Sequence, residues 1–183
     1  MVSMNFFEKF WVNRLNKMYV PRGVLSLIQR ANLQVTGSSL EIGAGIGYTS
    51  LAILEKYHPD KVVITDFDIS QVEKGQKLAA KKFGTIPSMV EYRQEDALQL
   101  SFEDRSFDFV IGTLCFHHIE GNRGQTFVKT PKAFQEVNRV LKPAGIFLYW
   151  DLLNRTLVDD FFKQLRYATL FTQKEKAIYQ KPN

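Results

Sequence analysis

The chain has 183 residues, of which 45% are hydrophobic and 23% charged, so it is long enough to fold as one globular domain with a sizeable core. Its single cysteine, Cys115, excludes an internal disulfide and a cysteine-based zinc site. No uninterrupted apolar run is long enough for a signal peptide or a membrane span, which predicts a cytoplasmic protein without a membrane partner. The net charge of +5 is concentrated near the two ends, and a solvated surface explains it more simply than an acidic partner.

Residues 1–37 predict a helical segment that packs on, or covers, the site of a main domain spanning residues 38–183. Large apolar residues recur at helical spacing in the first of two expected helices. They are Phe6, Phe7, Phe10, Trp11, Leu15 and Met18. The second helix is expected to begin at Pro21, a residue suited to a first turn, and to end near Ala31.

A glycine-rich turn follows the first expected strand, at residues 39–42, and precedes a helix at residues 48–57. The motif E-x-G-x-G-x-G consists of Glu41, Gly43, Gly45 and Gly47. Glycines in such a turn let the backbone adopt positive φ and approach a ligand closely. A dinucleotide fingerprint needs G-x-G-x-x-G, and Tyr48 stands where its third glycine would be, which disfavours a nicotinamide oxidoreductase.

Apolar strands and helical patterns alternate through the rest of the chain. Strands are expected at residues 62–65, 90–93, 107–114 and 146–150, and helices at 70–83, 130–141 and 157–165. Ser70 and Thr130 are the candidate N-caps, and residues 167–172 and 176–181 predict a β-hairpin. The alternation indicates a doubly wound, mostly parallel α/β sheet, in which ligands bind at the carboxyl ends of the strands.

Four further motifs follow the glycine turn in order. They are I-T-D-F-D-I-S at residues 64–70, Q-E-D-A at 94–97, F-D-F-V-I-G-T-L-C-F-H-H-I at 107–119 and E-V-N-R-V-L-K-P-A-G at 136–145. Over residues 38–151 the chain resembles the class I S-adenosylmethionine-dependent methyltransferases that act on small molecules. Ala144 replaces the first glycine of a pair in that family, which should matter little if its φ is negative.

The resemblance implies a Rossmann-like, three-layer α/β/α fold with seven strands and S-adenosylmethionine as the cofactor. It places the glycine turn, with Glu41 and Ala44, against the cofactor. It implies that an acid after the second strand binds the ribose; Asp66 is preferred and Asp68 is the alternative. It implies the remaining contacts as follows: Phe67 lies against the adenine, Asp96 and Ala97 bind the adenine edge, and the backbone of Gly112 and Thr113 lies beside the methionine portion.

Two adjacent histidines close the fourth motif. His117 or His118 could remove a proton from the methyl acceptor, and His118 matches the usual position in the family. The competing interpretation is that one or both cap the strand end by bonding backbone groups. A metal pair is not expected, because adjacent residues on an extended chain point apart.

The predicted reaction is transfer of a methyl group to a small-molecule acceptor by in-line displacement. A nucleic-acid methyltransferase is one alternative, and a non-catalytic S-adenosylmethionine-binding subunit is the other. The connection between His118 and Glu136 is longer than usual for the family, and residues 120–125 within it are polar. Arg123, Gln125, Phe127 and Lys129 are therefore candidate substrate contacts, and a solvated surface loop is the alternative. The resemblance also implies that Tyr19 could lean over the cofactor, and packing in the core is the alternative. The pattern does not indicate an oligomeric state.

Overall fold

The computed structural model describes residues 6–120 and 127–183, with the side chains of α1 described from residue 17 onward. The helices are α1 (Phe6–Arg30), α2 (Tyr48–Tyr57), α3 (Ile69–Phe83), α4 (Phe116–Glu120), α5 (Thr130–Val140) and α6 (Arg155–Gln164). The strands are β1 (Ser38–Ile42), β2 (Lys61–Asp66), β3 (Val90–Gln94), β4 (Phe107–Thr113), β5 (Leu141–Trp150), β6 (Ala168–Gln173) and β7 (Lys176–Gln180).

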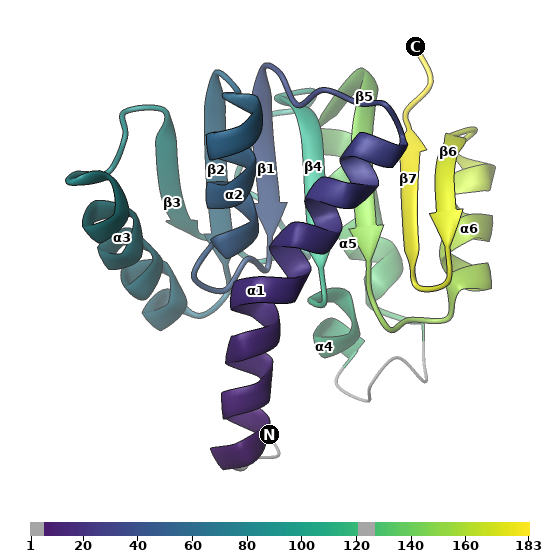
Figure 1. The fold of residues 1–183 in the computed structure, drawn as a ribbon. Helices are drawn as coiled ribbons and strands as arrows, with labels where there is room; N and C mark the ends of the chain where they lie inside the picture. Colours follow the sequence, from purple (N-terminus) through teal and green to yellow (C-terminus); the bar gives the residue numbers. More distant parts are fainter. Residues whose placement is uncertain (1–5, 121–126) are drawn as a thin grey trace.

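The seven strands form one sheet in the order β3-β2-β1-β4-β5-β7-β6. The first five strands in that order run parallel, and β7 is antiparallel to both β5 and β6. Figure 1 shows α1, α2 and α3 on one face of the sheet and α5 and α6 on the other, which makes three layers. The predicted doubly wound, three-layer fold and its closing hairpin are therefore confirmed.

Hydrophobic side chains fill both interfaces of the sheet. On one face, Phe134 of α5 and Phe162 of α6 pack against Phe147 and Tyr179, with ring centroids 4.7–6.3 Å apart. On the other face, α1 and α2 cover the middle of the sheet, and α2 and α3 cover β2 and β3. Burial on both faces explains why the parallel strands read as continuous apolar runs.

The N-terminal segment differs from the prediction of two helices, because α1 is continuous through Pro21. Val20, Val24, Leu27 and Ile28, all at most 5% exposed, belong to the core against the sheet. Packing on both sides of the proline offsets the one helical hydrogen bond that its missing N–H removes. Figure 1 shows α1 changing direction along its length, as an internal proline predicts. The division of the chain at residue 37 and the covering of the site stay predictions.

Both predicted N-caps are wrong. Asp68 caps α3, since its carboxylate accepts from the Ser70 N–H at 2.8 Å. Lys129 precedes α5 and contributes no side-chain cap. There, the N–H groups of Val128, Lys129 and Thr130 donate to one oxygen of Glu120 at 2.7–3.0 Å, so a carboxylate from α4 replaces the cap.

Ala144 has a φ of +58°, so the condition under which its replacement of glycine should matter little is not met. It lies within β5, in an irregular stretch between Leu141 and Ile146 where the pairing with β4 shifts register. An alanine in the left-handed region costs about 1 kcal/mol relative to glycine. The chain tolerates this cost within a stretch of β5 held by the N–H of Lys181, which donates to the carbonyl of Gly145 at 2.9 Å.

Two further observations bear on the predictions. Within the part of the chain that the structure describes, no helix is long and apolar enough to cross a membrane. Arg123 and Gln125, predicted as substrate contacts, lie outside the described residues, and so do the side chains of most of the N-terminal aromatic stripe. The cytoplasmic location stays a prediction.

Candidate functional site

The glycine turn lies at the carboxyl ends of the parallel strands and is fastened to β2. The Ala44 N–H donates to the Thr65 carbonyl at 2.8 Å, and the Gly45 N–H donates to Asp66 Oδ2 at 2.7 Å. The Gly47 N–H then closes the turn by donating to the Ala44 carbonyl at 3.0 Å. The turn and the first acid after β2 therefore form one hydrogen-bonded unit.

Gly43 and Gly45 are glycines for different reasons. A Cβ on Gly43 would lie 2.4 Å from the Cβ of Cys115, so this glycine lets the turn pack against the segment after β4. Gly45 has a φ of +57° and nothing within 4 Å of a built Cβ, which is the open space that a close-lying ligand requires. Gly45 therefore leaves room for a ligand to approach the backbone, whereas Gly43 is explained by packing.

Glu41, predicted to bind the cofactor, is only 2% exposed. Its Oε2 accepts from the Ser50 N–H at 2.9 Å and from the Ser50 hydroxyl at 2.6 Å. Burial raises the pKa of Glu41 to about 7, and the hydrogen bonds from Ser50 limit the rise. The side chain therefore stabilises the start of α2, where Gly47 provides no side-chain cap.

The segment after β2 separates the two candidate aspartates. Asp66 is half-buried and faces the glycine turn, whereas Asp68 is exposed and caps α3. The hydrogen bond from the Ser70 N–H lowers the pKa of Asp68. Between them, Phe67 is 70% exposed, an unusual state for a large aromatic side chain and one suited to stacking on a planar ligand. Binding of the ribose by Asp66 stays a prediction. Asp68 has a structural role, since it caps α3.

Asp96 and Ala97 follow β3 on the same edge. Asp96 is exposed, and one of its oxygens accepts from the Leu98 N–H at 2.9 Å, which holds the carboxylate in a tight turn. Ala97 is half-buried beside it. β3 pairs with β2 up to Asp66 opposite Gln94, so the turn starts next to the Asp66 segment.

Gly112 and Thr113 end β4 and are both buried. A Cβ on Gly112 would lie 2.3 Å from the ring of Phe116, so the glycine is required to seat this ring in the core. Burial also raises the pKa of the neighbouring Cys115 thiol well above its ordinary value, which keeps it protonated. The proposed contact of Gly112 and Thr113 with a cofactor would involve their backbone.

His117 and His118 lie in the short helix α4 and not on an extended strand end, which the sequence did not predict. Their ring centroids are 4.0 Å apart, so the premise that adjacent side chains point apart is wrong here. His117 is 8% exposed, and its Nδ1 lies 2.6 Å from Asp151 Oδ1. His118 is exposed to solvent on one side. The protein around the rest of its ring, and next the neighbouring His117, lower the pKa of His118. Among the residues described, no group of three or more metal-type ligands occurs.

Glu120 fastens the C-terminal end of α4. Burial tends to raise the pKa of this carboxyl, but the three N–H groups that donate to it from the start of α5 outweigh burial and lower the pKa to about 2. Glu120 is therefore ionised at neutral pH. It ties the histidine-bearing helix to α5 across the loop between them.

Asp151 is a site residue that sequence reasoning missed. It directly follows β5 and has no exposed surface. It accepts from the Phe116 N–H at 2.7 Å and from the Leu152 N–H at 2.6 Å, besides its contact with His117. A charged residue directly after an apolar strand at the carboxyl edge was the available signal; its partner is 34 positions away, so no local spacing reveals the pair.

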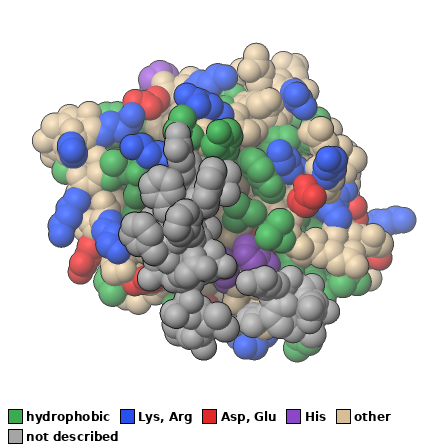
Figure 2. Space-filling model, turned by 60° about the horizontal axis from the view of Figure 1, so that its bottom comes forward, with side chains coloured by type: hydrophobic (Ala, Val, Ile, Leu, Met, Phe, Trp, Pro, Cys, Tyr) green, Lys and Arg blue, Asp and Glu red, His purple; other side chains and the backbone are tan. Residues whose placement is uncertain are grey.

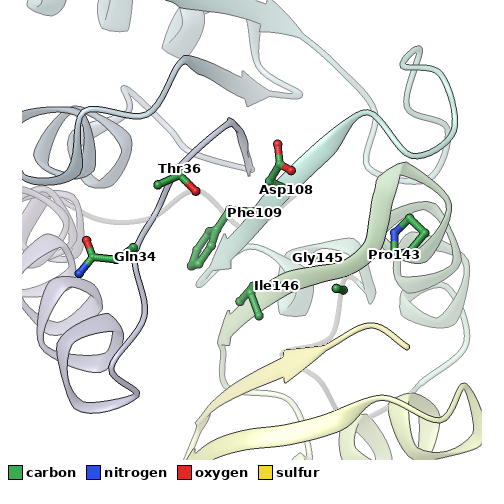
Figure 3. Close-up of a pocket in the computed structure, with 8 residues that line it drawn as sticks. Gln34, Thr36, Asp108, Phe109, Pro143, Gly145 and Ile146 are labelled. Carbon is green, nitrogen blue, oxygen red and sulfur yellow. The ribbon is translucent and has the colours of Figure 1, made fainter. Parts of the chain in front are cut away.

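Hollows elsewhere on the molecule are less suited to the predicted chemistry. Figure 3 shows one of about 240 Å³ at the amino end of β4 and β5, where Gln34, Asp108 and Gly145 contribute to the lining. Asp108 already accepts from the Ser38 N–H and the Lys142 ammonium, each at 2.8 Å. This hollow lies at the edge opposite the glycine turn, so the carboxyl edge is the better candidate site.

Comparison with known proteins shows the family of the chain. The family described as "Methyltransferase domain" matches residues 40–149, which is more than half of the chain. An uncharacterised methyltransferase of Bacillus subtilis, YcgJ, is 33% identical over 125 residues, covering 68% of this chain and 44% of YcgJ. The ubiquinone/menaquinone biosynthesis C-methyltransferase UbiE of Brucella canis is 36% identical over 112 residues, covering 61% of this chain and 38% of UbiE. The chain spans less than half the length of these curated relatives.

Solved structures of methyltransferases have a similar fold. The YcgJ structure superposes with a TM-score of 0.58 at 30% identity, over 79% of this chain and 57% of YcgJ. Phosphoethanolamine N-methyltransferase 2 of Haemonchus contortus, in complex with S-adenosylhomocysteine, gives a TM-score of 0.67 at 21% identity, over 80% and 37%. With the seven-stranded sheet and the matched domain, the chain belongs to the class I S-adenosylmethionine-dependent methyltransferases.

Proposed function

We propose that this chain binds S-adenosylmethionine at the carboxyl edge of its sheet and transfers the methyl group to a small molecule. One observation carries the proposal: Phe67, 70% exposed, lies between two carboxylates directly after β2, beside a glycine turn with open space over Gly45. An aromatic platform beside acceptors for hydroxyl groups is what an adenosine needs. Asp66 would then hold the ribose, Phe67 the adenine face, and Asp96 and Ala97 the adenine edge.

The donor, when bound, supplies a methyl group on a sulfonium: the acceptor atom forms a bond to the carbon, and the carbon–sulfur bond breaks with its electron pair left on sulfur. The chain's own residues have three tasks. They align the acceptor for in-line attack, exclude water and accept any proton that the acceptor loses. The backbone of Gly112 and Thr113 would position the methionine portion, and α4 presents two histidines at the same edge.

A nucleic-acid acceptor is the second candidate, and one feature favours it. A groove of about 650 Å³ runs between α1, α2 and α3, and its lining includes Lys17, Arg22, Lys81 and Lys82. Glu55 also lines the groove, and it pairs with Lys82 at 2.9 Å. The surplus of cations would attract a phosphate backbone, but Leu51, Ala52 and Leu78 make much of the remaining lining apolar.

A thermal-shift screen tests the proposal. S-adenosylmethionine or S-adenosylhomocysteine at 100 times its Kd adds about 2.7 kcal/mol to the free energy of unfolding. For a chain of this size the melting temperature should rise by roughly 5–10 °C. NAD and NADP are the controls, and a short RNA tests the second candidate. A shift with the nicotinamide nucleotides alone would contradict the proposal; a salt-sensitive shift with RNA would favour the second candidate.

A further inference from the structure

The contact between Asp151 and His117 fixes the orientation of the imidazole. Asp151 has no exposed surface, and its two oxygens accept from the Phe116 N–H, the Leu152 N–H and His117. Both oxygens of Asp151 accept from backbone N–H groups, and a carboxylate only accepts hydrogen bonds, so we assign the proton of the 2.6 Å contact to the Nδ1 of His117. In the neutral imidazole the lone pair is then on Nε2, the nitrogen free to accept a proton.

This pair lies beside the glycine turn. Cys115, two residues before His117, fills the space where Gly43 lacks a side chain, so α4 follows directly on the segment packed against the turn. Phe116 is fully buried and anchors the helix in the core between them. The paired imidazole is therefore held rigidly next to the part of the edge proposed to bind the donor.

His118 lacks the same arrangement. It is exposed, and among the described residues no carboxylate lies within hydrogen-bond distance of its ring. A buried carboxylate stabilises an imidazolium that forms on its partner, whereas an exposed ring depends on water. The geometry therefore favours His117, although the family position matches His118.

Two aliphatic residues bonded to the pair's surroundings are exposed. Leu152, whose N–H donates to Asp151, is 60% exposed, and Val128, whose N–H donates to Glu120 of α4, is 76% exposed. Figure 2, which views the carboxyl edge, shows histidine surface next to hydrophobic side chains. Exposed aliphatic groups at a site favour an apolar ligand body, and a neutral hydroxyl is an acceptor that needs a base to take up its proton.

We propose that Asp151 positions His117 to accept the proton of a hydroxyl group on an apolar methyl acceptor. This rests on the proposed function. The hydroxyl oxygen forms the bond to the methyl carbon as its proton passes to Nε2 of His117, and the carbon–sulfur bond of the donor breaks. The resulting imidazolium is paired with the Asp151 carboxylate and later releases the proton to water.

The test compares two aromatic acceptors that differ in whether a proton must be removed. 2-Naphthol carries a hydroxyl that is neutral at pH 7, and 4-nitrothiophenol is already a thiolate at that pH. In His117→Gln and Asp151→Asn, methylation of 2-naphthol should fall about 10²- to 10⁴-fold, the usual loss on removing a general base. Methylation of 4-nitrothiophenol should change less than about threefold. His118→Gln, the neighbouring change of the same kind, should lose less naphthol activity than His117→Gln.

A second readout uses the protein without any ligand. Nitrogen-15 NMR of the imidazole rings reports which nitrogen carries the proton. His117 should show the Nδ1–H tautomer in the wild type and lose it in Asp151→Asn. Because Asp151 is buried, Asp151→Asn could lower the melting temperature, so the folding of both variants is first compared with the wild type by circular dichroism. If Asp151→Asn does not fold, the kinetic comparison of His117→Gln with the wild type still decides the test.

The outcomes separate the two proposals. Failure of S-adenosylhomocysteine to bind, measured by calorimetry, would overturn the proposed function and this inference with it. Normal binding with equal naphthol rates in the wild type and His117→Gln would overturn the inference alone. The inference alone would also be overturned if the methyl group passed only to the thiolate, only to an amine such as 2-naphthylmethylamine, or to none of these acceptors. An Nε2–H tautomer of His117 in the wild type would overturn it too.

Discussion

Asp66→Ala is expected to weaken binding of S-adenosylhomocysteine about 100-fold, whereas Asp68→Ala should change it less than about threefold. Each hydrogen bond to a charged group contributes roughly 1.5–3 kcal/mol, and a 100-fold loss corresponds to about 2.7 kcal/mol. The Asp66→Ala variant would lose the bonds from the carboxylate to the ribose hydroxyls and also the acceptor for the Gly45 N–H. Calorimetric titration of the two variants measures the difference.

The two aspartates form a matched pair, since they are two residues apart at the same edge of the sheet. Asp68→Ala should instead lower the melting temperature, because α3 loses the side chain that accepts from the Ser70 N–H. Equal losses of affinity in the two variants would contradict the assignment of the ribose to Asp66.

Phe116→Ala is expected to lower the free energy of unfolding by about 3–5 kcal/mol, the usual cost of deleting a buried phenylalanine. For a chain of this length the melting temperature should fall by roughly 10 °C. The ring has no exposed surface, fills the space over Gly112 and lies 4.9 Å from the ring of Phe134. Its loss would leave a cavity directly under α4, so denaturant unfolding should show a large drop in stability.

Phe134→Ala is the control, because Phe134 is equally buried but belongs to α5. Both variants should lose similar stability. Amide hydrogen exchange across residues 114–120 should accelerate more in Phe116→Ala, since only that change removes the anchor of α4. Equal exchange in the two variants, or an unchanged stability of Phe116→Ala, would show that the ring does not hold the histidine helix.

The sequence predicted the features that depend on local backbone chemistry. The bounds of α2 agree with the prediction at both ends, and the hairpin of β6 and β7 forms about the expected turn. The glycine turn was recognisable because its spacing reflects backbone requirements that few residues meet. For the same reason the family and its cofactor could be inferred from the order of the motifs, while the acceptor could not.

Features that depend on distant contacts were missed or misplaced. The sequence predicted that a helix begins at Pro21, but core packing on both sides of this residue keeps α1 continuous. α4 was not predicted, because what fastens it is Phe116 in the core and Asp151 from the end of β5. Glu41 was assigned to a ligand from its motif position, and only the fold shows its contact with Ser50.

Amide chemical-shift mapping of the protein titrated with S-adenosylhomocysteine tests the central claim most directly. The largest changes are expected in residues 43–47, 66–68 and 96–97, which border the carboxyl edge of the sheet. Changes concentrated instead around Gln34, Asp108 and Gly145, at the hollow on the opposite edge, would contradict the account, and so would an absence of changes at saturating ligand.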